Sequence, residues 1–131
     1  MVVDTSAIIA ILFREPAARA VAEAIRSHRK RTISSASVIE ASVVLIRRGR
    51  EALLADLDLL LSTSRIEPMP VTKEQIRLAQ DGFLRYGKGQ HEARLNFGDC
   101  FSYALAKASG QPLLFVGSDF SKTDLEAVTL P

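Results

Sequence analysis

Short apolar runs that end in polar or acidic residues alternate along this chain with longer stretches of helical periodicity. Runs of this length are typical of parallel strands buried on both faces when helices separate them. Strands are expected at residues 2–3, 32–34, 113–116 and 126–130, and an edge strand or connector at residues 66–71. Helices are expected between them at residues 7–13, 16–25, 38–47, 51–63, 72–86 and 99–109. The pattern therefore predicts an α/β fold with a mainly parallel sheet between helices.

The length and composition narrow the class of protein. The chain has 131 residues, 47% of them hydrophobic, and a formal net charge of +2, which suits a single domain over residues 1–131. No window approaches the roughly 18 consecutive apolar residues of a membrane span, and no basic segment precedes the first apolar run. We therefore expect a cytoplasmic protein without a membrane segment. The one cysteine, Cys100, is expected to fill the core rather than act as a nucleophile.

Residues 95–110 form the stretch around which the other elements are expected to lie. Gly98 interrupts what precedes it, Asp99 follows, and Gly110 ends an apolar helical stripe. An aspartate before a helix is a common N-cap, because its carboxylate accepts hydrogen bonds from free backbone N–H groups. Asp99 therefore has two interpretations, as a cap or as a functional carboxylate at the start of a core helix.

Three further acids occupy comparable positions. Asp4 directly follows the first strand, Glu40 is expected in the first turn of a helix, and Asp119 follows the strand at residues 113–116. Each has a structural alternative: Asp4 can cap the next helix, and Ser37 and Glu40 have the spacing of a capping box. Because ligands in open α/β sheets collect at the carboxyl ends of the strands, we expect these acids and Asp99 to converge.

Converging carboxylates repel one another and would hold protons unless a cation neutralised them. Mg²⁺ or Mn²⁺ suits such oxygen ligands best, whereas zinc is disfavoured by two distant histidines and a single cysteine. A divalent ion of this kind can lower the pKa of a bound water and orient it for attack on a phosphodiester.

The stretch at residues 87–94 is glycine-rich and basic, and it leads directly to Asn96 and Asp99. Its cationic candidates, Lys88, His91 and Arg94, could contact an anionic substrate that enters the site. An ordinary surface loop is the alternative. The stretch lacks the spacing of a Walker phosphate-binding loop.

Four segments together resemble the PIN-domain ribonucleases, and closely the VapC toxins of type II toxin–antitoxin modules. These segments lie at residues 2–7, 34–40, 96–101 and 113–124, so the resemblance spans essentially the whole chain. For this family it implies a three-layer α/β/α fold with a mainly parallel central sheet and Mg²⁺- or Mn²⁺-dependent endonucleolytic cleavage of RNA. It also implies homodimers and inhibition by a cognate VapB-type antitoxin, in a heterotetramer or larger assembly.

The resemblance also assigns roles to residues. Asp4 and Asp99 would be the principal metal ligands, with Glu40 binding directly or through water. Asp119 matches a late acidic position that is the least uniform of the four in the family. Ser118 stands where many relatives carry a further Asn, Asp or Glu, which favours one firmly held ion. The side chains expected to support the ligands are Thr5, Ser6, Asn96 and Ser102.

Two other readings stay open from the sequence. A phosphatase-like enzyme with Asp4 as nucleophile would normally need a second Asp two residues later, where this chain has Ser6. A catalytically inactive PIN-like module that binds RNA or a protein partner is the other alternative. Leu59 lies outside the apolar stripe of residues 51–63 and could belong to the core, a dimer interface or a groove for a partner helix.

Overall fold

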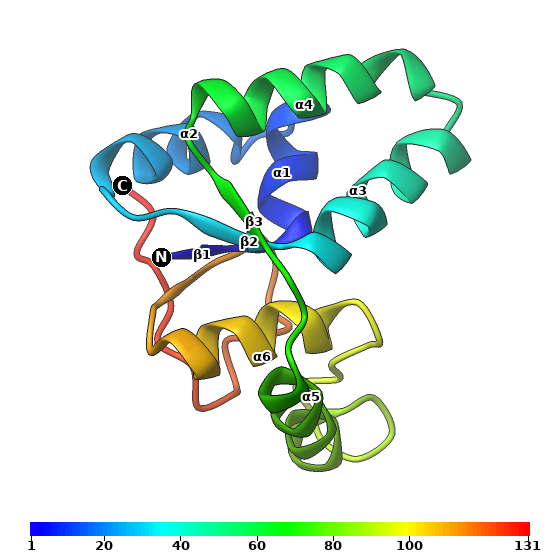
Figure 1. Cartoon of the computed structure of the whole chain (residues 1–131), viewed down its shortest axis with the longest axis vertical. Helices are drawn as coiled ribbons and strands as arrows, with labels where there is room; N and C mark the ends of the chain where they lie inside the picture. Colours follow the sequence, from blue (N-terminus) through cyan, green and yellow to red (C-terminus); the bar gives the residue numbers. More distant parts are fainter.

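A four-stranded parallel sheet forms the centre of the protein. The computed structural model describes residues 1–131, and Figure 1 shows the sheet between two groups of helices. The strands are β1 (Val2–Val3), β2 (Thr32–Ser34), β3 (Glu67–Met69) and β4 (Leu113–Leu114). Their order is β3-β2-β1-β4, and every neighbouring pair is parallel. The chain therefore leaves β1 toward β2 and β3 on one side and adds β4 on the other.

Helices cover both faces of this sheet, which confirms the predicted three-layer α/β/α architecture. One layer holds α1 (Thr5–Leu12), α2 (Ala18–Ser27), α3 (Ser35–Arg47), the 3₁₀ turn η1 (Glu51–Leu53) and α4 (Leu54–Thr63). The opposite layer holds α5 (Lys73–Tyr86) and α6 (Asp99–Ser109). No helix is both long and apolar enough to span a bilayer.

Two apolar cores fill the spaces above and below the sheet, and adjacent strand residues divide between them. Val3 and Leu114 belong to the core under α1–α4, whereas Val2 and Leu113 belong to the core under α6. Successive side chains of a strand point to opposite faces, so two apolar residues in a row bury one on each side. This division explains why the buried strands appear in the sequence as continuous apolar runs.

The first turns of α1 and α3 differ from the prediction. α1 begins at Thr5, because Asp4 is its N-cap and its side chain accepts from the backbone N–H of Ser6. α3 begins at Ser35, where the hydroxyl of Ser34 accepts from a backbone N–H in the first turn. The alternative of a capping box at Ser37 and Glu40 is therefore excluded, and the prediction that Glu40 lies in the first turn of the helix is wrong.

The buried face of α5 is also not the predicted one. The spacing of Ile76, Ala79, Phe83 and Tyr86, at steps of 3, 4 and 3 residues, predicts an apolar stripe on this helix. Ile76 and Phe83 are nevertheless 50% and 39% exposed, whereas Gln75 and Gly82 are buried. Gly82 packs against the ring of Tyr103 on α6, where an added Cβ would lie 2.5 Å from ring carbons. α5 thus approaches α6 through its smallest residue, which leaves larger apolar side chains outside.

The prediction for the C-terminal strand is wrong, whereas the prediction for the leucine-rich helix is confirmed. The predicted strand at residues 126–130 is wrong, since that segment makes only an isolated bridge between Ala127 and Leu113. In α4, Leu57 and Leu61 are buried and Leu59 is 58% exposed. The expectation that Leu59 lies outside the buried stripe is confirmed.

Candidate active site

The candidate site lies at the carboxyl ends of β1 and β4, where the strand order reverses direction. Asp4 directly follows β1, and Asp119 lies in the turn that follows β4. Connections from these neighbouring strands leave in opposite directions, which opens the crevice that binds ligands in open α/β sheets. α6 begins at Asp99 and α3 carries Glu40.

Asp4 is held by hydrogen bonds on both carboxylate oxygens and is 4% exposed. Its Oδ2 accepts from the backbone N–H of Ser6 at 2.9 Å and from the Ser6 hydroxyl at 2.6 Å. Its Oδ1 accepts from the hydroxyl of Ser102 at 2.5 Å. The Ser6 oxygen in turn accepts from the backbone N–H of Val116, just beyond β4, at 3.0 Å. Ser6 and Ser102 therefore fix the orientation of Asp4 from two other elements.

Ser37 extends this network although the sequence suggested only a capping role for it. Its hydroxyl lies 3.3 Å from that of Ser102 and is fully buried. Because Ser102 gives its proton to Asp4, Ser37 must be the donor in this pair. Thr5 does not bond Asp4: its hydroxyl donates to the backbone carbonyl of Ser37 at 3.2 Å.

Asp99 is the first residue of α6 rather than its cap, and it exchanges hydrogen bonds with Asn96 just before the helix. The side-chain oxygen of Asn96 accepts from the backbone N–H of Asp99 at 2.9 Å, and Asp99 Oδ2 accepts from the backbone N–H of Asn96 at 2.9 Å. This reciprocal pair has the spacing of a capping box. It fixes one oxygen of Asp99 at the start of the helix. Cys100, the buried thiol beside it, donates to the backbone carbonyl of Asn96.

Glu40 reaches the start of α6 because residue 98 is a glycine. A Cβ on Gly98 would collide with the carboxylate of Glu40, so no larger residue fits there without moving that side chain. Burial raises the pKa of Glu40; its contact with Thr5 opposes this, and the charge of Asp4 raises the pKa further.

The pKa of Asp99 responds to the charges of the three other predicted acids. The pKa of Asp99 is raised to about 7, chiefly by burial and against the opposing hydrogen bond from the Asn96 backbone. The negative charges of Asp4, Asp119 and Glu40 each contribute to this rise. Carboxylates influence one another in this way only when they lie close together. The four acids therefore occupy one neighbourhood, with Asp119 as its exposed member.

The predicted cationic residues divide into two groups. Lys88 and Arg94 line one cavity with Asp119. His91 lies outside this cavity: its ring packs edge-on against Tyr86 with the centroids 5.2 Å apart, and its Nδ1 accepts from the backbone N–H of Ala93.

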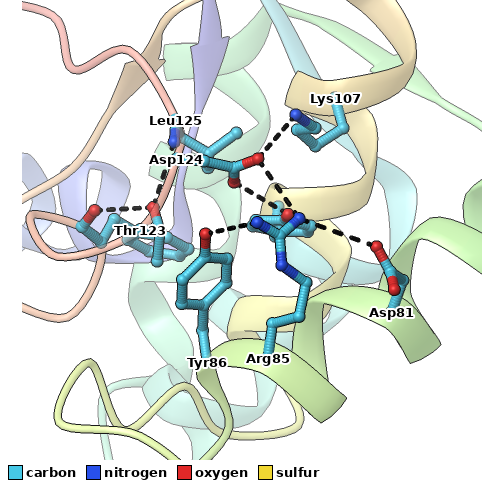
Figure 2. A network of polar contacts seen from close by, with 9 residues as sticks. Asp81, Arg85, Tyr86, Lys107, Thr123, Asp124 and Leu125 are labelled. Carbon is cyan, nitrogen blue, oxygen red and sulfur yellow. Dashed lines mark hydrogen bonds and ion pairs between the residues drawn. The ribbon is translucent and has the colours of Figure 1, made fainter.

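A separate network anchors the segment that carries Asp119 (Figure 2). Asp124 accepts from the hydroxyl of the buried Tyr103 at 2.9 Å and pairs with Lys107 at 2.8 Å. Arg85 of α5 lies 3.6 Å from the same carboxylate. Burial alone would raise the pKa of Asp124, but the hydrogen bonds and charges of these partners hold it below its usual value. The C-terminal segment is thereby tied to both α5 and α6.

Comparison with known proteins identifies the family. A family model described as "PIN domain" matches residues 1–126. The chain is 48% identical over 128 residues to the ribonuclease VapC of Mycolicibacterium smegmatis, and the match covers 98% of this chain and 99% of that relative. This chain belongs to the VapC family of PIN-domain ribonucleases. VapC proteins are the ribonuclease toxins of VapBC toxin–antitoxin modules, and the predicted family is confirmed.

Other VapC proteins agree with this assignment. Ribonuclease VapC30 of Mycobacterium tuberculosis is 45% identical over 131 residues, with both chains covered completely. The crystal structure of M. tuberculosis VapC20, described as a "Sarcin-Ricin loop cleaving toxin", superposes with a TM-score of 0.79 at 19% identity over 99% of this chain and 98% of that one. A toxin–antitoxin complex from Klebsiella pneumoniae superposes with a TM-score of 0.66 at 17% identity over 94% and 92% of the two chains. These two structures support the fold alone.

The donor set of this VapC chain fits a hydrated divalent ion rather than a closed cage of side chains. No three His, Cys, Asp or Glu side chains are arranged so that they could enclose a metal ion by themselves. Mg²⁺ usually keeps several waters and binds through one or two carboxylates together with substrate phosphate. Asp4 and Asp99 offer hard carboxylate oxygens of this kind, and the charges of Glu40 and Asp119 act on the same neighbourhood.

Two contributors to the site were misread or missed from the sequence. Ser37 supports Ser102 and does not cap α3, and Gly98 makes room for Glu40. Asn96, by contrast, bonds Asp99 through both its backbone N–H and its side-chain oxygen, in agreement with the supporting role expected of it. No local signal marks Ser37 or Gly98, because each depends on a neighbour distant in sequence.

Proposed function

We propose that this VapC ribonuclease hydrolyses RNA phosphodiesters with a water molecule activated by Mg²⁺ or Mn²⁺ at the four acids. The observation that carries the proposal is the gathering of acids at the start of α6: Ser102 of this helix bonds Asp4, and the Glu40 carboxylate lies against Gly98, directly before Asp99. When bound, the ion supplies a more acidic water and neutralises charge on the phosphate and leaving oxygen. Its charge would also relieve the repulsion among the four carboxylates.

Different side chains of the site would bind the ion and the substrate. Asp4 and Asp99 would be direct ligands, since hydrogen bonds from Ser6, Ser102 and the Asn96 backbone hold their carboxylates in fixed positions. Each carboxylate oxygen has a further lone pair beyond those hydrogen bonds. Fixed ligands reduce the reorganisation that accompanies reaction.

Glu40 and Asp119 would supply further oxygen ligands to the ion, in addition to those of Asp4 and Asp99. Glu40 lies on α3 against Gly98 and would bind directly or through water. Asp119 is exposed on the turn after β4 and would be the weakest ligand. Lys88 and Arg94, which line the cavity beside Asp119, would bind RNA phosphate; His91 is the weaker candidate because its ring packs on Tyr86.

We also propose a cognate VapB-type antitoxin and a VapC homodimer as partners, in a heterotetramer or larger assembly. Exposed apolar side chains support this proposal, because large exposed apolar patches commonly mark protein interfaces. Phe97 is 80% exposed, and other exposed apolar side chains line hollows on both sides of it: Ile39, Val43, Phe83 and Leu84.

The proposed activity is tested by sequencing the 5′ ends of cellular RNA after brief induction of the wild type and of Asp4→Ala. We expect new RNA ends with the wild type and none with Asp4→Ala, although both proteins accumulate as folded chains. The ends would also identify the RNA target. Identical new ends from both proteins would contradict the proposed role of Asp4.

A further inference from the structure

A polar cavity lies between the loop at residues 87–94 and the turn after β4, on the Asp119 side of the acids. Its volume is about 410 Å³, and only one of its eight lining residues is hydrophobic. Three cationic side chains line it, namely Lys88, Arg94 and Lys122. Asn96, whose side chain accepts from the backbone N–H of Asp99, also lines it, so the cavity adjoins the candidate active site.

An ion pair joins the two loops that form this cavity. Lys122 Nζ lies 2.8 Å from Glu92 Oε2, and the side chains are 51% and 65% exposed. Lys122 lowers the pKa of Glu92 through its hydrogen bond and charge, so Glu92 stays ionised at neutral pH. Exposed pairs of this kind contribute little to stability, because water solvates both partners well when they separate. Lys122 can therefore change partners at small cost.

The loop holds Arg94 in an unusual backbone conformation. Arg94 has φ of 56°, in the left-handed region that residues other than glycine, asparagine and aspartate seldom occupy. A hydrogen bond from its backbone N–H to the carbonyl of His91, 3.1 Å long, stabilises this turn. Strained conformations persist where the surrounding structure enforces them and are common at binding sites. The turn keeps a second cation beside Lys88 in the cavity wall.

We propose that this cavity binds an RNA phosphate adjacent to the scissile one, and that Lys122 exchanges Glu92 for that phosphate when RNA binds. This inference rests on the proposed function, because it places the neighbouring phosphate relative to the acids. Proteins that bind single strands use a positively charged groove along the backbone. Lys122 is thereby a substrate-binding residue, and Glu92 is a competing anion that occupies Lys122 in the free protein.

RNA fits this cavity better than an acidic protein segment does. The cavity opens beside the carboxylates that would bind the scissile phosphate, and a polynucleotide carries another phosphate at each neighbouring nucleotide. An acidic segment from a partner protein carries no phosphate that could bind at the acids and continue into this cavity. Lys88, Arg94 and Lys122 instead match a second phosphate on the same strand.

The test measures RNA binding without cleavage, so that it does not depend on catalysis. A short, fluorescently labelled, mixed-sequence single-stranded RNA is titrated with wild type, Lys122→Gln and Glu92→Gln in EDTA. We expect Lys122→Gln to weaken binding several-fold and to reduce the slope of log affinity against log salt by about 0.7. Glu92→Gln should tighten binding, because the competing anion is gone.

The matched control is the exposed ion pair of Arg19 and Glu23 on α2, at 3.1 Å. Arg19→Gln and Glu23→Gln make the same charge changes on a helix outside the cavity, and we expect each to alter RNA affinity less than its counterpart. Thermal unfolding of all four variants checks that each is folded.

Two results would overturn the proposal. Equal weakening by Lys122→Gln and Glu92→Gln would mean that the ion pair only holds the loops together. Unchanged RNA affinity in both variants, with loss of poly-glutamate binding by Lys122→Gln, would assign the cavity to an acidic protein segment. Failure of the proposed function would give a different result. Cleavage that persists in Asp99→Asn would contradict the role of the acids in catalysis, but it would leave the RNA affinities of the Lys122 and Glu92 variants in EDTA unaffected.

Discussion

The hydroxyl of Ser102 donates a 2.5 Å hydrogen bond to Oδ1 of Asp4, across 98 positions of sequence. Both side chains are buried, and the bond joins the first turn of α6 to the end of β1. The two principal ligands proposed here, Asp4 and Asp99, are thus held relative to each other by a side chain that lies one turn along the helix from Asp99.

Ser102→Ala should lower RNA cleavage by roughly 10- to 100-fold, as is typical when a hydrogen bond to a metal ligand is removed. It should also destabilise the fold by about 1 to 3 kcal/mol, because it leaves an oxygen of the buried Asp4 without its hydrogen-bond donor. Steady-state cleavage and urea unfolding measure the two effects. Ser42→Ala is the matched control, since the Ser42 hydroxyl bonds only the carbonyl of Val38 within α3. Equal activity in the two variants would remove Ser102 from the site.

Gly98→Ala should reduce cleavage without unfolding the protein. Gly98 has helical backbone angles that alanine adopts easily, so the only obstacle is the carboxylate of Glu40, a flexible group that can move aside. The displaced Glu40 can then no longer serve the site. Cleavage rates should show that Gly98→Ala adds little to Glu40→Ala in a double-mutant cycle. Fully additive losses would show that the two residues act independently.

Asp124→Ala should destabilise the protein by about 1 to 3 kcal/mol, because the buried hydroxyl of Tyr103 loses its acceptor and Lys107 its partner. The measurement is urea unfolding monitored by circular dichroism. Glu126→Ala, a nearby exposed acid, is the control and should change the free energy of unfolding much less. A matching loss in the control would mean that the network in Figure 2 does not anchor the C-terminal segment.

Stability of the metal-free protein should fall as pH rises from about 3.8 to about 7, the unperturbed and folded-state pKa values of Asp99. Over this range the unfolded chain has released the Asp99 proton and the folded chain has not, so raising the pH favours unfolding. Urea unfolding in EDTA should show this slope in the wild type and a weaker one in Asp99→Asn. The same slope in both would contradict the raised pKa. Added Mg²⁺ should stabilise the wild type most at the upper end of the range.

The layers of the fold were predictable because the signals for them are local. Paired apolar residues such as Val2-Val3 mark strands buried on both faces, and acids after strands mark the ligand edge of the sheet. Packing between distant residues was not predictable in the same way. The face of α5 that is buried depends on Gly82 meeting Tyr103, and the reach of Glu40 depends on Gly98. Apolar periodicity alone therefore selected Ile76 and Phe83, which the structure leaves exposed.

RNA cleavage by wild type and Asp99→Asn across a Mg²⁺ titration tests the account most directly, with each preparation checked for folding by circular dichroism. We expect wild-type cleavage to rise with Mg²⁺ to saturation and to stop in EDTA. Asp99→Asn should be slower by about 100-fold or more, because a lost metal ligand removes several kcal/mol of transition-state stabilisation. Undiminished cleavage by Asp99→Asn, or by the wild type in EDTA, would contradict the claim that the four acids hold a catalytic cation.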